Sequence, residues 1–83
     1  MRRAARVDAN QAEIVEALRR IGARVYLIKW PCDALVAYRG RWIGLEIKAP
    51  GGRLTKDQVK LIAECDAPVH VVQTPEEAVK CCL

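Results

Sequence analysis

The sequence lacks any long run of apolar residues, and its first ten residues, MRRAARVDAN, lack the apolar segment of a secretion signal. A membrane span needs about 20 consecutive apolar residues, and a signal peptide needs a shorter apolar run near its start. We therefore expect a cytoplasmic protein that does not enter a membrane.

The spacings typical of zinc ligands are also missing. No two cysteines form a CxxC pair, and the chain has one histidine, His70. Structural zinc sites are built from closely spaced cysteine and histidine ligands, so we expect none here. In a chain without a secretion signal, the thiols are interpreted as free and as small apolar side chains. They are Cys32, Cys65, Cys81 and Cys82.

Acidic residues are scarce in the first 60 positions. There, 13 basic residues outnumber 6 acidic ones and give a net charge of +7, whereas positions 61–83 carry −3. A concentration of arginine and lysine in one part of a small domain suits a surface that binds a polyanion. A solvated basic face gives the same pattern, and charge alone does not separate the two interpretations.

The chain also lacks internal repeats, linkers and low-complexity tracts, and its 83 residues have room for a single domain, 1–83. A hydrophobic fraction of 52% and a charged fraction of 29% are typical of a globular protein. A chain this short buries only about 60–65% of the surface that it exposes when unfolded. Association into a homodimer would therefore help to stabilise it.

Three stretches have the capping residues and apolar periodicity of helices, and four have the β-branched and aromatic residues of strands. The expected elements are helix 7–22, strand 24–30, strand 33–38, strand 42–48, helix 54–65, strand 67–73 and helix 74–82. The order αβββαβα predicts an α/β fold in which helices flank a small mixed β-sheet.

Helix caps support these boundaries. Asp8 is predicted to cap the first helix. Thr55 and Gln58 have the spacing of a capping box at the second helix, and Thr74 and Glu77 repeat that spacing at the third.

The segment IGLEIKAP, residues 43–50, carries two charged side chains within an apolar strand. Side chains alternate between the two faces of a strand, so Glu46 and Lys48 share the face opposite Leu45. An adjacent glutamate and lysine often belong to a solvated face, and that interpretation remains open for the pair alone.

A predicted hairpin brings a second carboxylate toward this pair. The residues RGR, 39–41, form the expected turn, and pairing Tyr38 with Trp42 around it brings Asp33 close to Ile47 and its neighbours. Two nearby carboxylates repel each other, and Mg²⁺ or Mn²⁺ would relieve that repulsion. Such an ion polarises a phosphoryl oxygen and activates water, and Lys48 would stabilise charge on the phosphate.

Asp33 and the EIK sequence at 46–48 resemble the D…(D/E)xK signature of the PD-(D/E)xK nuclease superfamily. The whole chain is similar to the VRR-NUC branch of that superfamily, through NQAEIVEALRRIGARV, PCDALVAYRG, LEIKAPGGRLTKDQ and PVHVVQTPEEAV. The resemblance implies a restriction-endonuclease-like core. It also implies an endonuclease that hydrolyses DNA phosphodiesters with Mg²⁺ or Mn²⁺, in a bacterium or a phage-infected cell.

The resemblance also implies a role for each site residue. Asp33, Glu46 and the carbonyl of Ile47 would bind the metal, and Lys48 would position the attacking water. Glu13, from the first helix, would bind a second metal or a ligand water, and Gln58 would orient Lys48 or the phosphate. Stand-alone VRR-NUC domains are associated with four-way DNA junctions and homodimers, so branched DNA is the expected partner.

Several of these positions have a simpler interpretation. Glu13 also suits the border of a helix face, and Gln58 suits the capping box alone. Four basic residues that follow a glycine-rich loop or flank the hairpin turn would contact DNA, or would be ordinary surface charges. They are Arg39, Arg41, Arg53 and Lys56.

Two further features bear on function. Trp30 and Trp42 are assigned to the core or to a dimer contact rather than to base stacking. The family motif before Asp33 is Gly-x-Pro-Asp, whereas this chain has WPCD at 30–33. The altered motif leaves open an alternative function, a non-catalytic module that retains the fold and binds nucleic acid.

Overall fold

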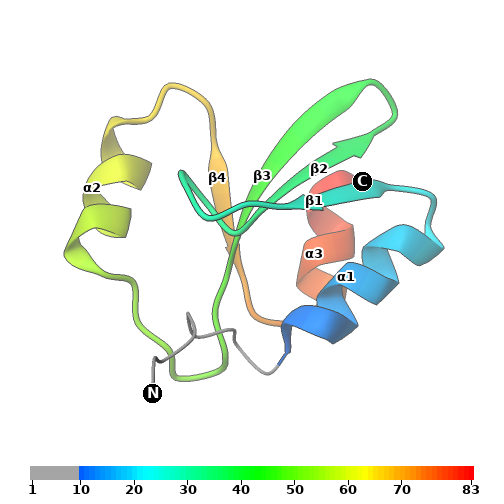
Figure 1. Ribbon diagram of the computed structural model, residues 1–83, viewed down its shortest axis with the longest axis horizontal. Coiled ribbons are helices and arrows are strands. Elements are labelled where there is room, and N and C mark those ends of the chain that lie inside the picture. Colours follow the sequence, from blue (N-terminus) through cyan, green and yellow to red (C-terminus); the bar gives the residue numbers. More distant parts are fainter. Residues whose placement is uncertain (1–9) are drawn as a thin grey trace, which may run out of the picture.

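The computed structural model describes residues 10–83 and shows a small mixed α/β domain (Figure 1). It contains a four-stranded sheet and three helices. In chain order the elements are α1 (Gln11–Arg20), β1 (Arg24–Leu27), β2 (Ala34–Tyr38), β3 (Arg41–Ile47), α2 (Lys56–Glu64), β4 (Val69–Val72) and α3 (Pro75–Cys82). No helix within 10–83 has both the length and the apolar character that crossing a membrane requires.

The sheet is mixed, with the strands in the order β1-β2-β3-β4. β1, β2 and β3 form an antiparallel meander, and β4 lies parallel to β3. A parallel neighbour needs a crossover connection, and the chain segment that contains α2 provides it.

The β2–β3 hairpin has a tighter turn than the sequence predicted. Tyr38 pairs with Arg41, and Ala37 pairs with Trp42. The predicted pairing of Tyr38 with Trp42 is therefore wrong by one residue. Arg39 and Gly40 form the turn with φ values of 51° and 80°. Positive φ at both central residues is the geometry of a two-residue hairpin turn that matches strand twist, and it shifts the register of the whole hairpin.

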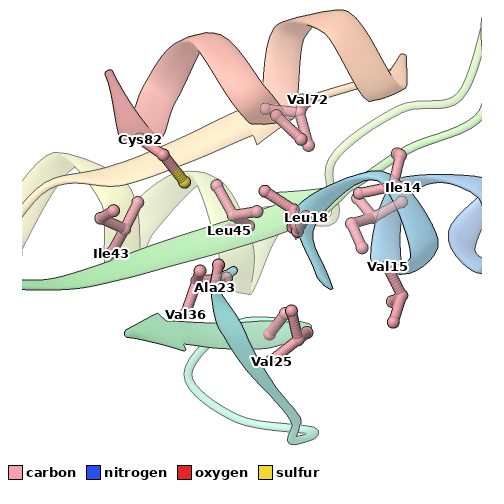
Figure 2. Packing of buried hydrophobic residues seen from close by; sticks show 13 residues of the cluster. Ile14, Val15, Leu18, Ala23, Val25, Val36, Ile43, Leu45, Val72 and Cys82 are labelled. Carbon is pink, nitrogen blue, oxygen red and sulfur yellow. The ribbon is translucent and has the colours of Figure 1, made fainter. Parts of the chain in front are cut away.

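The hydrophobic core lies between one face of the sheet and helices α1 and α3 (Figures 1 and 2). We call this side of the sheet the core face. Strand residues alternate between faces, so Ala34 and Val36 of β2 and Ile43, Leu45 and Ile47 of β3 are buried there. The fully or nearly fully buried core residues are Ile14, Val15, Leu18, Ala23, Val25, Ala34, Val36, Ile43, Leu45, Ile47, Val72, Ala78 and Cys82.

The opposite side of the sheet, which we call the open face, has much less cover. α2 stands apart from α1 and α3 (Figure 1), and none of its residues is buried. Trp42 of β3, on this side, is 62% exposed and Trp30, in the loop between β1 and β2, is 61% exposed. Their assignment to the core is therefore wrong, whereas a dimer contact stays a prediction. The sequence does not indicate which face of the sheet the helices leave uncovered, so it does not predict the exposure of Trp42.

The starts of the helices agree in part with the predicted caps. Asn10 is the N-cap of α1, and the predicted cap Asp8 lies outside the described residues. The capping box of Thr55 and Gln58 at α2 is confirmed. At α3, Thr74 accepts a hydrogen bond from the Glu77 amide.

The carboxylate of Glu77 closes a different loop from the one predicted. Its Oε1 accepts a hydrogen bond from the Gln73 amide at 2.6 Å, one residue before the expected partner Thr74. Only the Thr74 half of this capping box therefore forms as predicted.

All four cysteines are free, as the sequence predicted. Cys32 and Cys82 are buried, and burial raises the pKa of both thiols. Neutral buried thiols behave as small apolar side chains.

Candidate metal and nuclease site

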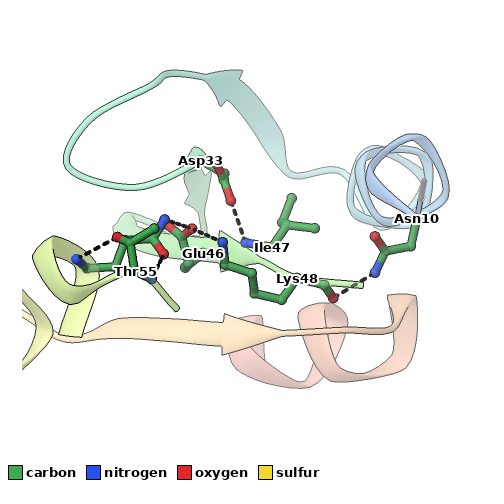
Figure 3. Close-up of polar contacts among 7 residues, drawn as sticks. Asn10, Asp33, Glu46, Ile47, Lys48 and Thr55 are labelled. Carbon is green, nitrogen blue, oxygen red and sulfur yellow. Dashed lines mark hydrogen bonds and ion pairs between the residues drawn. The ribbon is translucent and has the colours of Figure 1, made fainter. Parts of the chain in front are cut away.

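The hairpin register places two acidic residues on neighbouring strands. Ala34 pairs with Leu45, and the Asp33 amide donates to the Leu45 carbonyl at 3.0 Å, so Asp33 continues the ladder opposite Glu46. The Asp33 carboxylate accepts a hydrogen bond from the Ile47 amide at 2.7 Å (Figure 3). This contact fixes one carboxylate oxygen at the end of β3.

Glu46 is the one buried charged residue among those described, with 2% of its surface exposed. It shares the open face of β3 with Lys48, as the strand alternation predicted. The Lys48 Nζ lies 3.5 Å from Glu46 Oε2, and the Gln58 side-chain amide donates to the same oxygen at 2.5 Å. Glu46 is thus held by an ammonium group from its own strand and an amide from α2.

The electrostatics of Glu46 show that its negative charge is poorly compensated. Burial and, to a smaller extent, the nearby Asp33 carboxylate raise the pKa of Glu46 to about 7. Lys48 opposes the shift without cancelling it. A buried carboxylate that holds a proton near neutral pH, with a second carboxylate beside it, can bind a cation in place of that proton.

Gln58 forms the predicted capping box and also contacts Glu46, whereas its role in orienting Lys48 or the phosphate stays a prediction. Its side-chain oxygen accepts from the Thr55 amide at 2.8 Å, which completes the capping box. Its side-chain nitrogen donates to Glu46. Because the capping box orients the Gln58 amide, the start of α2 presents a donor to the carboxylate at a fixed position.

Asn10 joins the same region, although the sequence analysis did not single it out. Its Nδ2 donates to the Lys48 carbonyl at 3.1 Å and to the Gln73 carbonyl at 2.5 Å. These contacts tie the start of α1 to the chain at the ends of β3 and β4. The Asn10 Oδ1 is buried and has no hydrogen-bond partner within residues 10–83. The sequence placed Asn10 inside the predicted helix 7–22, and in the structure it precedes α1 and makes no side-chain capping bond.

The other predicted site residues lie apart from this cluster. Glu13 is exposed on the first turn of α1, and no hydrogen bond or ion pair joins it to the cluster in the described chain. Arg53 and Lys56 are exposed near the start of α2. Arg39 and Arg41 lie at the hairpin turn, at the opposite end of β3 from Glu46.

Arg41 already has a structural contact. Its guanidinium donates to the Cys82 carbonyl at the end of α3. A cation at a helix C-terminus satisfies an otherwise unpaired carbonyl and interacts favourably with the helix dipole. Arg41 therefore helps to fasten α3 to the sheet.

The donor set suits a hard divalent cation only in part. Asp33 and Glu46 supply two carboxylates on adjacent strands, and carboxylate oxygen is the ligand that Mg²⁺ and Mn²⁺ prefer. Among residues 10–83, however, no three side chains of histidine, cysteine, aspartate or glutamate are grouped closely enough to hold a metal ion. The cluster fits a cation that is held by two carboxylates and completed by backbone oxygen and water.

Cys32, next to Asp33 in the chain, has a packing role. Gly44 leaves a gap on the open face, and a side chain added there would begin 3.4 Å from the Cys32 sulfur. The thiol donates to the Ala34 carbonyl at 3.4 Å. Cys32 thus fills space beside Gly44.

Comparisons of the chain with protein-family models, with curated proteins and with solved structures found no match.

Proposed function

We propose that this protein is a metal-dependent endonuclease that hydrolyses DNA phosphodiesters, with the restriction-endonuclease-like core of the VRR-NUC branch of PD-(D/E)xK nucleases. One observation carries the proposal. Asp33, just before β2, lies opposite Glu46 of β3, and the Lys48 amine is 3.5 Å from Glu46. A buried glutamate beside a half-buried aspartate and a lysine, at one end of the two central strands, has little structural purpose unless it binds something.

Each side chain has a distinct role in this proposal. Asp33, Glu46 and the Ile47 carbonyl would hold Mg²⁺ or Mn²⁺, and the bound ion would polarise the phosphate and activate water. Lys48 orients the attacking water and stabilises negative charge on the phosphate. Gln58 holds the Glu46 carboxylate in place, which is supported by their 2.5 Å contact.

Glu13 has a less direct role in the proposed mechanism. It lies on the first turn of α1, close in sequence to Asn10, whose side chain contacts the Lys48 carbonyl. From this turn Glu13 would bind a second metal or a water in the substrate complex. Its exposed carboxylate leaves it free for that role.

The proposed substrate is branched DNA, such as a four-way junction, cut by a homodimer. The net charge of +7 on the first 60 residues supports a polyanionic substrate. Arg53 and Lys56 would contact phosphates beside the site, because both lie close to Gln58. Arg39 would contact DNA beyond the far end of β3, and Arg41 would do so only with the part of its guanidinium that Cys82 leaves free. Two sites related by a two-fold axis suit the two-fold symmetry of a junction.

The decisive test is cleavage of labelled junction, flap, single-strand and duplex DNA with Mg²⁺ or Mn²⁺. We expect cleavage of at least one branched substrate, and a loss of at least about 100-fold in rate for Glu46→Gln and Lys48→Ala. Glu16→Gln is the matched control, since Glu16 is exposed on α1 and pairs with Arg20. Intact substrates under all conditions would refute the proposal.

A non-catalytic nucleic-acid-binding module is the second candidate. Cys32 beside Asp33 and the lack of a third clustered ligand within residues 10–83 favour it. Calorimetric titration with Mn²⁺ separates the two candidates. The nuclease loses metal binding in Asp33→Ala, whereas a binding module has no metal binding to lose and keeps its affinity for DNA.

A further inference from the structure

The open face of the sheet carries a pair of aromatic side chains that the proposed catalytic residues do not use. Tyr26 of β1 and Trp42 of β3 lie with ring centroids 6.0 Å apart and ring planes inclined by 51°. Tyr26 is 49% exposed and Trp42 is 62% exposed. We call these two residues the aromatic pair.

The strand register explains how residues from non-adjacent strands meet. β2 lies between β1 and β3, and its residue Ala37 pairs with Trp42 on one side and with Arg24 on the other. Tyr26 pairs with Leu35 in the next open-face row, so the rings of Tyr26 and Trp42 meet diagonally across β2, beside the small side chain of Ala37. The sheet thus presents a wide, rigid aromatic surface without a helix above it.

Positive charge borders the aromatic pair. Arg24 stands in the same cross-strand row as Trp42 and is exposed. A pocket of about 380 Å³ next to Tyr26 is lined by Arg19 and Arg24 and by no acidic residue. Exposed aromatic rings bordered by arginine are the composition of surfaces that bind single-stranded nucleic acid, where bases stack on rings and phosphates contact cations.

The aromatic pair also lies at a useful distance from the proposed catalytic residues. Trp42 and Glu46 are on the same face of β3, four residues apart, which is about 13 Å along a strand. Stacked nucleotides rise by about 3.4 Å each, so about four of them span this distance. A strand with a phosphate at Lys48 therefore reaches the aromatic pair with a nearby base.

A second copy of this chain fits the surface less well. In a two-fold interface the same patch faces itself, which would bring Arg24 of one copy toward Arg24 of the other. The aromatic pair and its pocket offer no carboxylate to neutralise those charges. DNA supplies both the flat apolar group and the negative charge that the patch lacks.

We infer that Tyr26 and Trp42 form a stacking platform for unpaired bases of a DNA strand that runs along the open face toward Lys48. The direction of that strand rests on the proposed nuclease function, whereas base stacking itself does not. The inference adds a substrate class to the proposal, namely DNA with unpaired bases next to the phosphate that is cut.

Tryptophan fluorescence gives a direct test. A Trp30→Phe background leaves Trp42 as the only indole in the chain. The background protein is titrated with a 12-nucleotide oligothymidine and with a blunt duplex of the same length, in EDTA. We expect the single strand to quench Trp42 emission strongly, and the duplex, whose bases are already stacked, to quench it little.

Paired variants separate stacking from other contributions. In a Trp30→Phe, Glu46→Gln background, Trp42→Leu keeps an apolar strand residue and removes the ring, so affinity for oligothymidine, followed by fluorescence anisotropy, falls at least about fivefold. Trp42→Phe keeps a ring and stays within about threefold. Arg24→Gln weakens binding of single strand and duplex alike and lowers its salt dependence.

Three results would overturn the inference. They are an unchanged Trp42 emission on adding the single strand, equal affinities of Trp42→Leu and Trp42→Phe, or a dimer by ultracentrifugation that dissociates in Trp42→Leu. The outcome is independent of the nuclease proposal. Quenching without any DNA cleavage retains the platform and refutes the nuclease, whereas unchanged Trp42 emission in a protein that cleaves DNA refutes only the platform.

Discussion

The two faces of the sheet differ in what covers them and in what they contain. The core face packs against α1 and α3 and buries only apolar residues. The open face holds the buried carboxylate of Glu46 and the exposed rings of Tyr26 and Trp42. Stability therefore comes mainly from one face, which leaves the other free to carry groups that destabilise the fold unless a ligand binds them.

The largest effect on stability is expected from the core face. Leu45 is fully buried, so Leu45→Ala should lower the free energy of unfolding by about 2–5 kcal/mol. Trp42→Ala, on the other face of the same strand, should lower it by about 1 kcal/mol or less. Urea unfolding of both variants measures the contrast, and similar losses would show that the open face is covered after all.

The pH dependence of stability tests the carboxylate on the open face. The pKa of Glu46 is about 7 in the fold against an ordinary value of 4.5, so between these pH values the folded state holds a proton that the unfolded state releases. The free energy of unfolding should fall as pH rises from about 4.5 to about 7, by on the order of 3 kcal/mol or less.

Urea titrations at several pH values in EDTA measure this slope. Glu46→Gln should flatten it, because the amide does not titrate. Addition of Mn²⁺ should weaken the slope in the original protein, since a bound cation replaces the proton. An identical slope in the glutamine variant would assign the pH dependence to another group.

The Asn10 side chain ties the start of α1 to the chain just after β3 and β4. Asn10→Ala leaves the Lys48 and Gln73 carbonyls without their side-chain donor, and we expect a loss of about 1–3 kcal/mol. Gln11→Ala, at the next position, is the control. If both variants unfold at the same urea concentration as the original protein, the two carbonyls are satisfied by solvent.

The smallest expected effect on stability comes from removing the N-cap of α2 or of α3. Thr55 and Thr74 cap α2 and α3, but only α3 has buried residues. Thr74→Ala should cost about 1 kcal/mol of global stability, whereas Thr55→Ala should cost less because α2 opens locally. Hydrogen exchange should show faster exchange confined to α2 in Thr55→Ala. Protection that falls throughout the chain would mean that α2 folds together with the core.

Much of the fold follows from local patterns. Period-two alternation in 43–47 and the capping box at Thr55 depend on neighbouring residues, so the sequence predicts both. The hairpin register is a different matter. Whether the turn contains two or three residues depended on the left-handed conformation of Arg39, which an arginine adopts rarely and which the sequence does not signal.

In the candidate site, too, only the features that depend on local patterns could be predicted. Strand alternation predicts that Glu46 and Lys48 share a face. The hairpin predicts that Asp33 lies close to them. The contact of Asn10 with Lys48 and Gln73 joins residues 38 and 63 positions apart, and nothing near Asn10 in the sequence indicates it. The exposure of Trp42 was missed because it depends on how far α2 stands from the sheet.

The parallel pairing of β3 with β4 determines where the chain can accept insertions. The connection between these strands, residues 48–68, includes α2 and contributes no buried side chain of its own. Lengthening such a connection twofold costs only about 0.6 kcal/mol in chain entropy. Insertions between Ala49 and Thr55 would thus add new surface beside Glu46 at little cost, which makes this segment the place where related chains can diversify while the helix-covered half stays constant.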